Sequence, residues 1–181
     1  MEYITIATTG DATDFGDLTV GRYHLASCSS SSRGVFGGGS KTDHSNADNI
    51  DYITIATASN ATDFGDLTVS RAQLASFSNG YRGVFGGGSA SNNTIDYVTI
   101  ATTGNATDFG DLVTGGTLLS GCANATRGVF GGGYYVSGTN KLQYITINTT
   151  GNATNFGNLA VTADFGDLTV SKNGFAACSG D

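Results

Sequence analysis

The chain has 181 residues, 39% of them hydrophobic, and a formal net charge of −7. It is long enough for one domain with a substantial core, but its 8 Lys and Arg residues form no basic stripe. We expect no nucleic-acid partner, because neutralising phosphates requires such a stripe. The sequence shows no apolar run that could span a bilayer and no secretory leader at its start, so we expect neither membrane insertion nor a signal peptide.

The first predicted strands lie within residues 1–20, where Tyr3 and Phe15 mark two short extended segments. Four segments follow in the next unit, where β-branched and aromatic residues alternate and polar or glycine turns separate the runs. They are Tyr23 to Ser29, Gly34 to Gly38, Tyr52 to Thr57 and Thr62 to Val69. No stretch shows the periodicity of an amphipathic helix, so we predict an all-β chain.

The same segments recur along the chain. The equivalent tyrosines are spaced by 49, 45 and 47 residues, and the equivalent phenylalanines follow the same spacings. We predict one repeat domain over residues 1–181, with units at about 1–20, 21–69, 70–115, 116–170 and 171–181. The repeated structural positions are Arg33, Gly37, Gly38, Tyr52, Phe64, Arg82, Gly86, Gly87, Tyr97, Phe109, Arg127, Gly131, Gly132, Tyr144 and Phe156.

Glycine occurs 28 times in a chain that contains no proline, and many of the glycines fall in one repeated block. Arg-Gly-Val-Phe-Gly-Gly-Gly covers residues 33–39, 82–88 and 127–133. No Lys-Ser/Thr pair and no helix follow the triplet, which excludes a phosphate-binding loop. We expect the glycines to adopt positive φ at the strand end and to let neighbouring units pack closely.

This pattern resembles the kelch repeat of β-propellers. The residues that carry the resemblance are Arg22 or Arg71, Leu25-Ala26, Gly37-Gly38, Tyr52 and Phe64. The resemblance implies a β-propeller of about four kelch-like blades, each with four short antiparallel strands. One of these blades would be built from both termini.

The two ends together supply too few strands for that blade. Residues 1–20 supply a third and a fourth strand, and Gly174 to Ser179 supplies a first strand. No segment of the chain is left to supply the second strand of that blade. We expect the resulting open edges to pair with another subunit or chain. Residues 155–163 are repeated directly in 164–172, and the second copy continues the register of the repeat. We expect the extra first copy to form a bulge or an additional edge strand, or to reflect slippage during gene duplication without a function.

Three cysteines, Cys28, Cys122 and Cys178, occupy one position of different units. Equivalent positions of different blades lie too far apart for a disulfide, which requires α-carbons within roughly 7 Å. We expect these cysteines to be small apolar residues buried against a neighbouring unit, without a catalytic or metal-binding role.

The acidic block with Asp11, Asp14 and Asp17 contains the candidate metal ligands. Carboxylates clustered beside a glycine are typical of calcium loops, although the spacing of an EF-hand is absent. In the alternative that we favour, these side chains accept hydrogen bonds from turn amides and keep strand edges soluble. We therefore expect no catalytic site, no cofactor and no resident metal, with these three residues as weak calcium candidates.

Two further groups of residues have candidate binding roles. Arg33, Arg82 and Arg127 precede the Gly-Val-Phe strands, and we expect them to pair with acidic residues of a neighbouring unit rather than with a ligand. Tyr134 and Tyr135 lie in a loop of variable length, where binding residues concentrate. This aromatic pair is a candidate binding loop, suited to stacking on a sugar ring.

One repeated sequence resembles repeat arrays of bacteriophage structural proteins, especially those of marine phages. It reads Tyr-Ile/Val-Thr-Ile-Ala-Thr-Thr-Gly-Asn-Ala-Thr-Asp-Phe-Gly-Asp-Leu. The resemblance implies a non-enzymatic structural or host-recognition module of the tail or tail-fibre type. Its partners would be copies of itself, other virion proteins or cell-surface glycans. Its location would be the virion, or the exterior after lysis. Two alternatives are a carbohydrate-binding, lectin-like propeller and a designed or amplified repeat scaffold.

Overall fold

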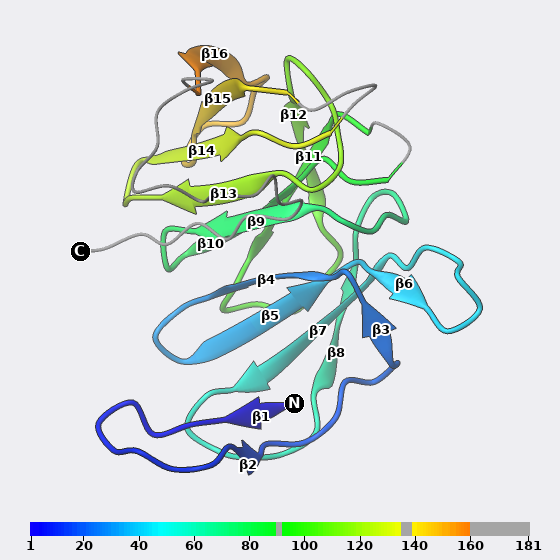
Figure 1. The fold of residues 1–181 in the computed structure, drawn as a ribbon, viewed down its shortest axis with the longest axis vertical. Helices are drawn as coiled ribbons and strands as arrows, with labels where there is room; N and C mark the ends of the chain where they lie inside the picture. The colour runs from blue at the N-terminus through cyan, green and yellow to red at the C-terminus, as the bar shows by residue number, and fades with distance from the viewer. Residues whose placement is uncertain (90–91, 135–138, 160–181) are drawn as a thin grey trace, which may run out of the picture.

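A computed structural model describes residues 1–89, 92–134 and 139–159 of the protein. These residues form sixteen β-strands in antiparallel sheets, and they contain no helix (Figure 1). The all-β prediction is confirmed for this part of the chain.

Three four-stranded sheets hold most of the strands, and in each the strands lie side by side in chain order. The first sheet contains β4 (Ala26–Ser29), β5 (Arg33–Gly37), β7 (Asn49–Thr54) and β8 (Thr62–Asp66). The second contains β9 (Ala75–Ser78), β10 (Arg82–Gly86), β11 (Thr94–Thr99) and β12 (Thr107–Asp111). The third contains β13 (Ser120–Ala123), β14 (Arg127–Gly131), β15 (Lys141–Thr146) and β16 (Thr154–Asn158).

Two short ribbons complete the described strands. β1 (Glu2–Tyr3) pairs with β2 (Thr13–Asp14), and Tyr3 lies opposite Thr13 as Tyr52 lies opposite Thr62 in the first sheet. The β1–β2 ribbon therefore has the register of a third and a fourth strand. β3 (Arg22–Tyr23) pairs with β6 (Ser40–Lys41), a ribbon that the sequence did not predict.

The strand bounds differ from the predicted ones at the first and third strands. The first strands begin later than expected because His24, Gln73 and Leu118 have φ of 57°, 59° and 58°, which interrupts an extended chain. The third strand of the first sheet begins at Asn49 and ends at Thr54, whereas the sequence predicted Tyr52 to Thr57. The second and fourth strands lie where the sequence placed them to within three residues.

A β-bulge sets a phenylalanine against a tyrosine ring in each four-stranded sheet; Phe64 and Phe109 are buried, whereas Phe156 is 52% exposed. In the first sheet Ile50 lies opposite Gly65 and Asp51 opposite Asp63, so Phe64 is the extra residue. The Phe64 ring packs edge-on against the Tyr52 ring at 5.9 Å between centroids. The same register shift and ring pair recur at Tyr97 with Phe109 and at Tyr144 with Phe156.

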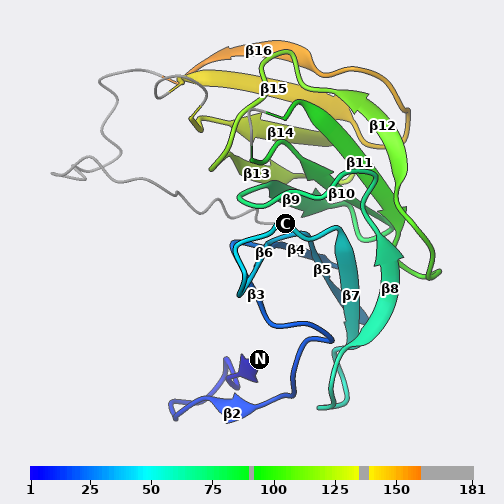
Figure 2. The ribbon, with the colours of Figure 1, turned by 90° about the vertical axis from the view of Figure 1, so that its right-hand side faces the viewer.

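The sheets are stacked in chain order, with the first strand β9 between β4 and β13 (Figures 1 and 2). Two clusters of buried apolar side chains join the first sheet to the second and the second to the third. Within the described residues the series is open, because β1 and β2 lie at one end and β16 at the other (Figure 2). The described structure is thus a stack of repeated antiparallel sheets.

Candidate binding site

Each second strand begins with an arginine whose guanidinium lies over a tyrosine ring of the third strand. Arg33 pairs with Thr54 in the ladder, so its side chain shares a sheet face with Tyr52, two residues along. The Arg33 Cζ lies 4.5 Å from the centroid of the Tyr52 ring, a cation–π contact. The other pairs are Arg82 with Tyr97 at 4.4 Å and Arg127 with Tyr144 at 4.5 Å.

Arg33 and Arg82 also connect neighbouring sheets. Arg33 Nη1 donates to the carbonyl oxygen of Ile100 in the second sheet's unit at 3.0 Å, and Arg82 Nη1 donates to that of Ile147 at 2.8 Å. We expected carboxylate partners for these arginines, and the structure gives rings and carbonyl oxygens instead. The reason is register, since the ladder places a tyrosine rather than an acid on the face that each arginine occupies.

The glycine triplets do what the sequence predicted for them. Gly38 and Gly39 have φ of 66° and 107°, a region that side chains disfavour. A β-carbon built on Gly37 would lie 2.8 Å from Cε1 of Phe85, because that ring packs against the glycine of the preceding sheet. Phe130 occupies the same place on Gly86, at 2.5 Å. Glycine is therefore required where one sheet receives the ring of the next.

The cysteine position faces the next sheet, as predicted for Cys28. Its side chain is buried, and the Sγ atom would lie 2.6 Å from a β-carbon built on Gly83. Burial raises the pKa of the Cys28 thiol to about 12, which keeps the thiol protonated. Cys122 is half-buried, and both cysteines are free thiols. Cys178 lies outside the described residues.

The structure contains two buried ion pairs that the sequence analysis did not predict. Arg22 and Asp51 approach to 2.9 Å in the first sheet's unit, and Arg71 and Asp96 to 2.7 Å in the second, with all four side chains inaccessible to solvent. Arg71 also donates to the carbonyl oxygens of Thr94 and Phe85. Burial raises the pKa of the Asp96 carboxyl and lowers that of the Arg71 guanidinium, and the opposite charge of the partner counteracts both effects.

The third unit replaces both members of this pair. Gln143 stands at the position of Asp51 and Asp96, and Gly116 stands at the position of the arginines. The Gln143 amide donates to the carbonyl oxygen of Thr114 and accepts from its N–H, each at 2.9 Å. This simultaneous change of acid and base was the signal in the sequence from which the pair could have been predicted.

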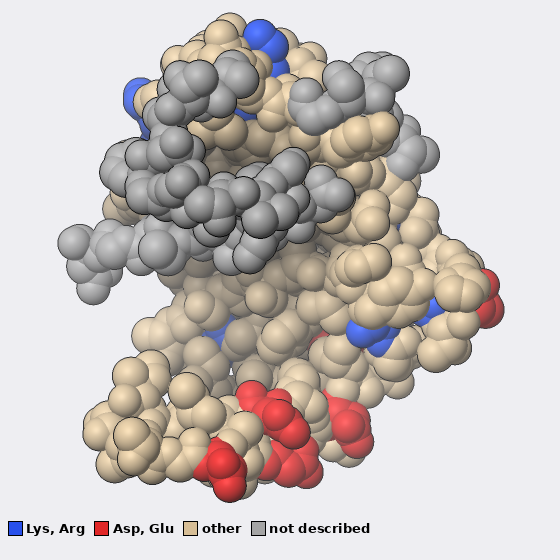
Figure 3. Space-filling model, in the orientation of Figure 1, with Lys and Arg blue, Asp and Glu red and all other residues tan. Residues whose placement is uncertain are grey.

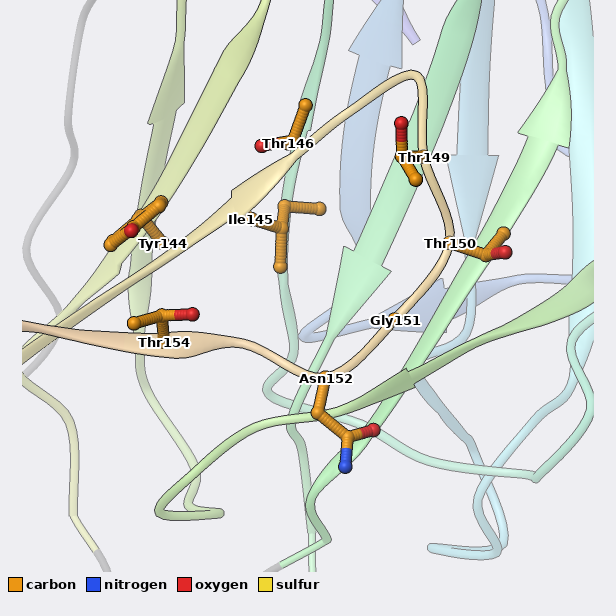
Figure 4. A pocket seen from close by; sticks show the side chains of 8 residues that line it. All are labelled: Tyr144, Ile145, Thr146, Thr149, Thr150, Gly151, Asn152 and Thr154. Carbon is orange, nitrogen blue, oxygen red and sulfur yellow. The ribbon is translucent and has the colours of Figure 1, made fainter.

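The hairpins between third and fourth strands form the candidate binding site, because they carry the same pocket in two units. One pocket of about 320 Å³ lies along the β15–β16 hairpin, where Figure 4 shows Tyr144 and Thr154 on the arms and Thr150 in the turn. An equivalent pocket of about 420 Å³ lies along β11–β12, with Tyr97 in the corresponding place. Each lining contains four threonines and one isoleucine or valine, so hydroxyls dominate both linings.

These hydroxyls have capacity for a ligand. In the described part of the chain, Thr146, Thr149, Thr150 and Thr154 make no side-chain hydrogen bond to another residue. The asparagine of each turn is engaged instead with the preceding unit. Asn152 Oδ1 accepts from the Asp111 N–H at 3.0 Å, and Asn60 and Asn105 accept in the same way from Asp17 and Asp66. The asparagines thus fix the hairpins, while the threonines remain exposed to solvent.

The calcium candidates lie at one end of the molecule. Asp11, Asp14 and Asp17 are all exposed, and Figure 3 shows acidic side chains gathered at the end that carries β1 and β2. Asp14 Oδ1 accepts from the Gly16 N–H at 3.1 Å, which is the turn role that we favoured. Among the described residues no three His, Cys, Asp or Glu side chains are close enough to hold a metal ion together.

The candidate loop with Tyr134 and Tyr135 is described in part. Tyr134 is 52% exposed, and its backbone pairs with that of Thr117 through two hydrogen bonds of 2.8 and 2.9 Å. Tyr135 lies outside the described residues, as does most of the duplicated segment.

Comparison with known proteins adds no family to these observations. No protein-family model matches the chain, and no curated protein matches it significantly. Among the described residues there is no helix with the length and hydrophobicity needed to cross a membrane.

Proposed function

We propose that this chain is a non-enzymatic structural and recognition module, which acts through glycan or protein contacts of its loops. The observation that carries the proposal is the recurrence of one threonine-rich pocket beside Tyr97 and beside Tyr144. Hydroxyl groups next to an aromatic edge match the polar and apolar faces of a sugar. Two equivalent sites in one rigid stack would give weak single contacts and strong combined binding.

A glycan array probed with the full chain tests this proposal. Thr103→Arg and Thr150→Arg each fill one pocket with a long side chain, and Ser31→Arg is the control, since Ser31 is exposed on a different turn. We expect each single variant to weaken binding and the double variant to lose it by more than tenfold, because avidity requires both sites. Equal binding by the double variant and the control would contradict the proposal.

We propose further that the three sheets are blades of a ring of about four. The side-by-side arrangement of β4, β9 and β13 supports this, because the first strands of propeller blades line the central channel. A closed ring of 181 residues has a radius of gyration near 16 Å, by the scaling of compact domains. Small-angle X-ray scattering of the monomer tests this, and a clearly larger radius would favour an extended stack.

We also propose a virion-associated, tail-type setting, which rests on the resemblance of the repeats to those of phage structural proteins. The test is mass spectrometry of purified phage particles. Peptides of this chain in intact particles are the expected result, and their restriction to the unassembled lysate fraction would contradict it.

A further inference from the structure

The first sheet faces the β1–β2 ribbon across a cleft of about 620 Å³, which we call the end cleft. Tyr3 and Phe15 line it from the ribbon, and Phe36, Ile53 and Ile55 line it from the first sheet's unit. Figures 1 and 2 show the β1–β2 ribbon standing at the end of the stack, beside the first sheet. The cleft is therefore the first junction of the repeat series.

Side chains that are buried at the inner junctions are exposed in the end cleft. Ile55 is 44% exposed, whereas the equivalent residues Ile100 and Ile147 are 1% and 0% exposed. Phe36 is half-buried, whereas the equivalent Phe85 is fully buried. At the inner junctions these side chains are thus covered by a structural element that the end cleft lacks among the described residues.

At the inner junctions the covering element is the second strand of the preceding unit, which makes three contacts there. Its arginine lies over the tyrosine of the third strand and donates to the carbonyl oxygen of the following unit's isoleucine. Its glycine lies under the following unit's phenylalanine ring. By position in the repeat, the same three partners at the end cleft are the Tyr3 ring, the Ile55 carbonyl oxygen and the Phe36 ring, and all three residues line the one pocket.

The edge of β1 is also open. The third strands β7, β11 and β15 each lie between two neighbours, whereas β1 is paired with β2 alone in the described structure. An exposed strand edge adds a further strand readily, with the backbone hydrogen bonds giving affinity and the side-chain pockets giving specificity.

We propose that the end cleft binds an extended Arg-Gly-Val-Phe-Gly-Gly-Gly strand supplied from outside residues 1–181. The strand pairs with β1 as β5 pairs with β7, so that its valine lies opposite Tyr3 and its first glycine opposite Ile4. Charge favours this occupant, since residues 1–21 contain Glu2, Asp11, Asp14 and Asp17 but no Lys or Arg. The three such strands of a second copy already lie inside its sheets. The proposal does not depend on ligand binding at the hairpin pockets.

A fluorescent peptide with the sequence of residues 80–88 tests the proposal by anisotropy with the full chain. We expect saturable binding, accompanied by slower hydrogen exchange of the Ile4 amide, which is equivalent to that of Ile53 and faces the added strand. The peptide variant Arg82→Ala, which loses the contacts with the Tyr3 ring and the Ile55 carbonyl oxygen, is expected to bind at least tenfold more weakly.

A pair of complementary variants, one enlarging a peptide residue and one shortening a side chain of the cleft, shows where the peptide binds. The peptide variant Gly86→Ala would place its β-carbon against the Phe36 ring, so we expect the native chain to reject it by at least tenfold. Phe36→Ala in the chain removes that ring, and we expect it to bind the two peptides equally. Phe36 lies at the end of the stack and is half-buried, so this variant retains the inner junctions.

Three outcomes would overturn the proposal. One is the absence of saturable peptide binding, and another is equal discrimination between the two peptides by the native and Phe36→Ala chains. The third is self-association of the native chain in sedimentation that Phe36→Ala abolishes, because a second copy would then be the occupant of the end cleft.

Discussion

At the scale of single residues, each charged side chain of a buried ion pair requires its oppositely charged partner. Arg71 and Asp96 lie together out of water, and a lone charge left there would carry the full cost of desolvation. The third unit avoids that cost by replacing both, with Gly116 and Gln143 in their places. A neutral amide that bonds the backbone of Thr114 is thus a natural alternative to the ion pair.

Single and paired substitutions at this site are expected to differ strongly. Arg71→Gly leaves the Asp96 carboxylate buried without its cation, and we expect a loss of about 3–5 kcal/mol in the free energy of unfolding. Arg71→Gly with Asp96→Gln copies the third unit and is expected to recover most of that loss. Urea denaturation measures both, and a double variant no more stable than the single one would contradict the interpretation.

The Cys28 thiol gives a prediction that depends on pH. Its pKa of about 12 in the folded chain lies above that of an unfolded cysteine, so the folded state holds the proton more tightly. This contribution to stability is complete below about pH 8.5 and is lost as the pH rises toward 12. At pH 8 we expect Cys122 to be alkylated by iodoacetamide and Cys28 to be protected until the chain unfolds. Mass spectrometry of the alkylated peptides checks this, and equal labelling would contradict it.

At the scale of strands and turns, the sequence predicted the elements better than their contacts. Alternating residues and glycine blocks were enough to find the second and fourth strands, because both signals are local. The late start of the first strand depends on positive φ at His24 and its equivalents. The residue types at these positions do not indicate a positive φ. The partners of Arg33 were mispredicted because they depend on register, which links residues distant in the sequence.

The glycine that receives a ring is expected to tolerate no side chain. In Gly86→Ala the added carbon would lie 2.5 Å from the Phe130 ring, and we expect a loss of about 1–3 kcal/mol from overpacking. Gly21→Ala is the matched control, because a β-carbon there would meet nothing within 4 Å. Thermal unfolding of the two variants makes the comparison, and a similar melting temperature for both would show that the ring can move aside.

At the scale of the whole molecule, stability rests on contacts between neighbouring sheets. The second sheet has neighbours on both sides, and its Val84, Phe85 and Ile95 are completely buried. At the start of the stack Ile4 is 63% exposed. In repeat proteins such differences set local stability, since each unit depends on the units beside it.

Hydrogen exchange is expected to follow this gradient. Amides of β10 and β11 should exchange most slowly, by global unfolding, whereas those of β1 and β2 should exchange fastest through local opening. Mass spectrometry of peptic fragments resolves these regions. Uniform protection along residues 1–159 would mean that the stack unfolds as a single cooperative unit.

The contact between ring and glycine gives every unit a direction, because Phe85 reaches back to Gly37 while Gly86 receives Phe130. A new unit inserted in the same orientation would present a ring to the unit before it and a glycine to the unit after it. Every junction in the longer array would then repeat one that already exists. The copy number of the repeat can therefore change by unequal recombination without any buried side chain acquiring a new kind of neighbour.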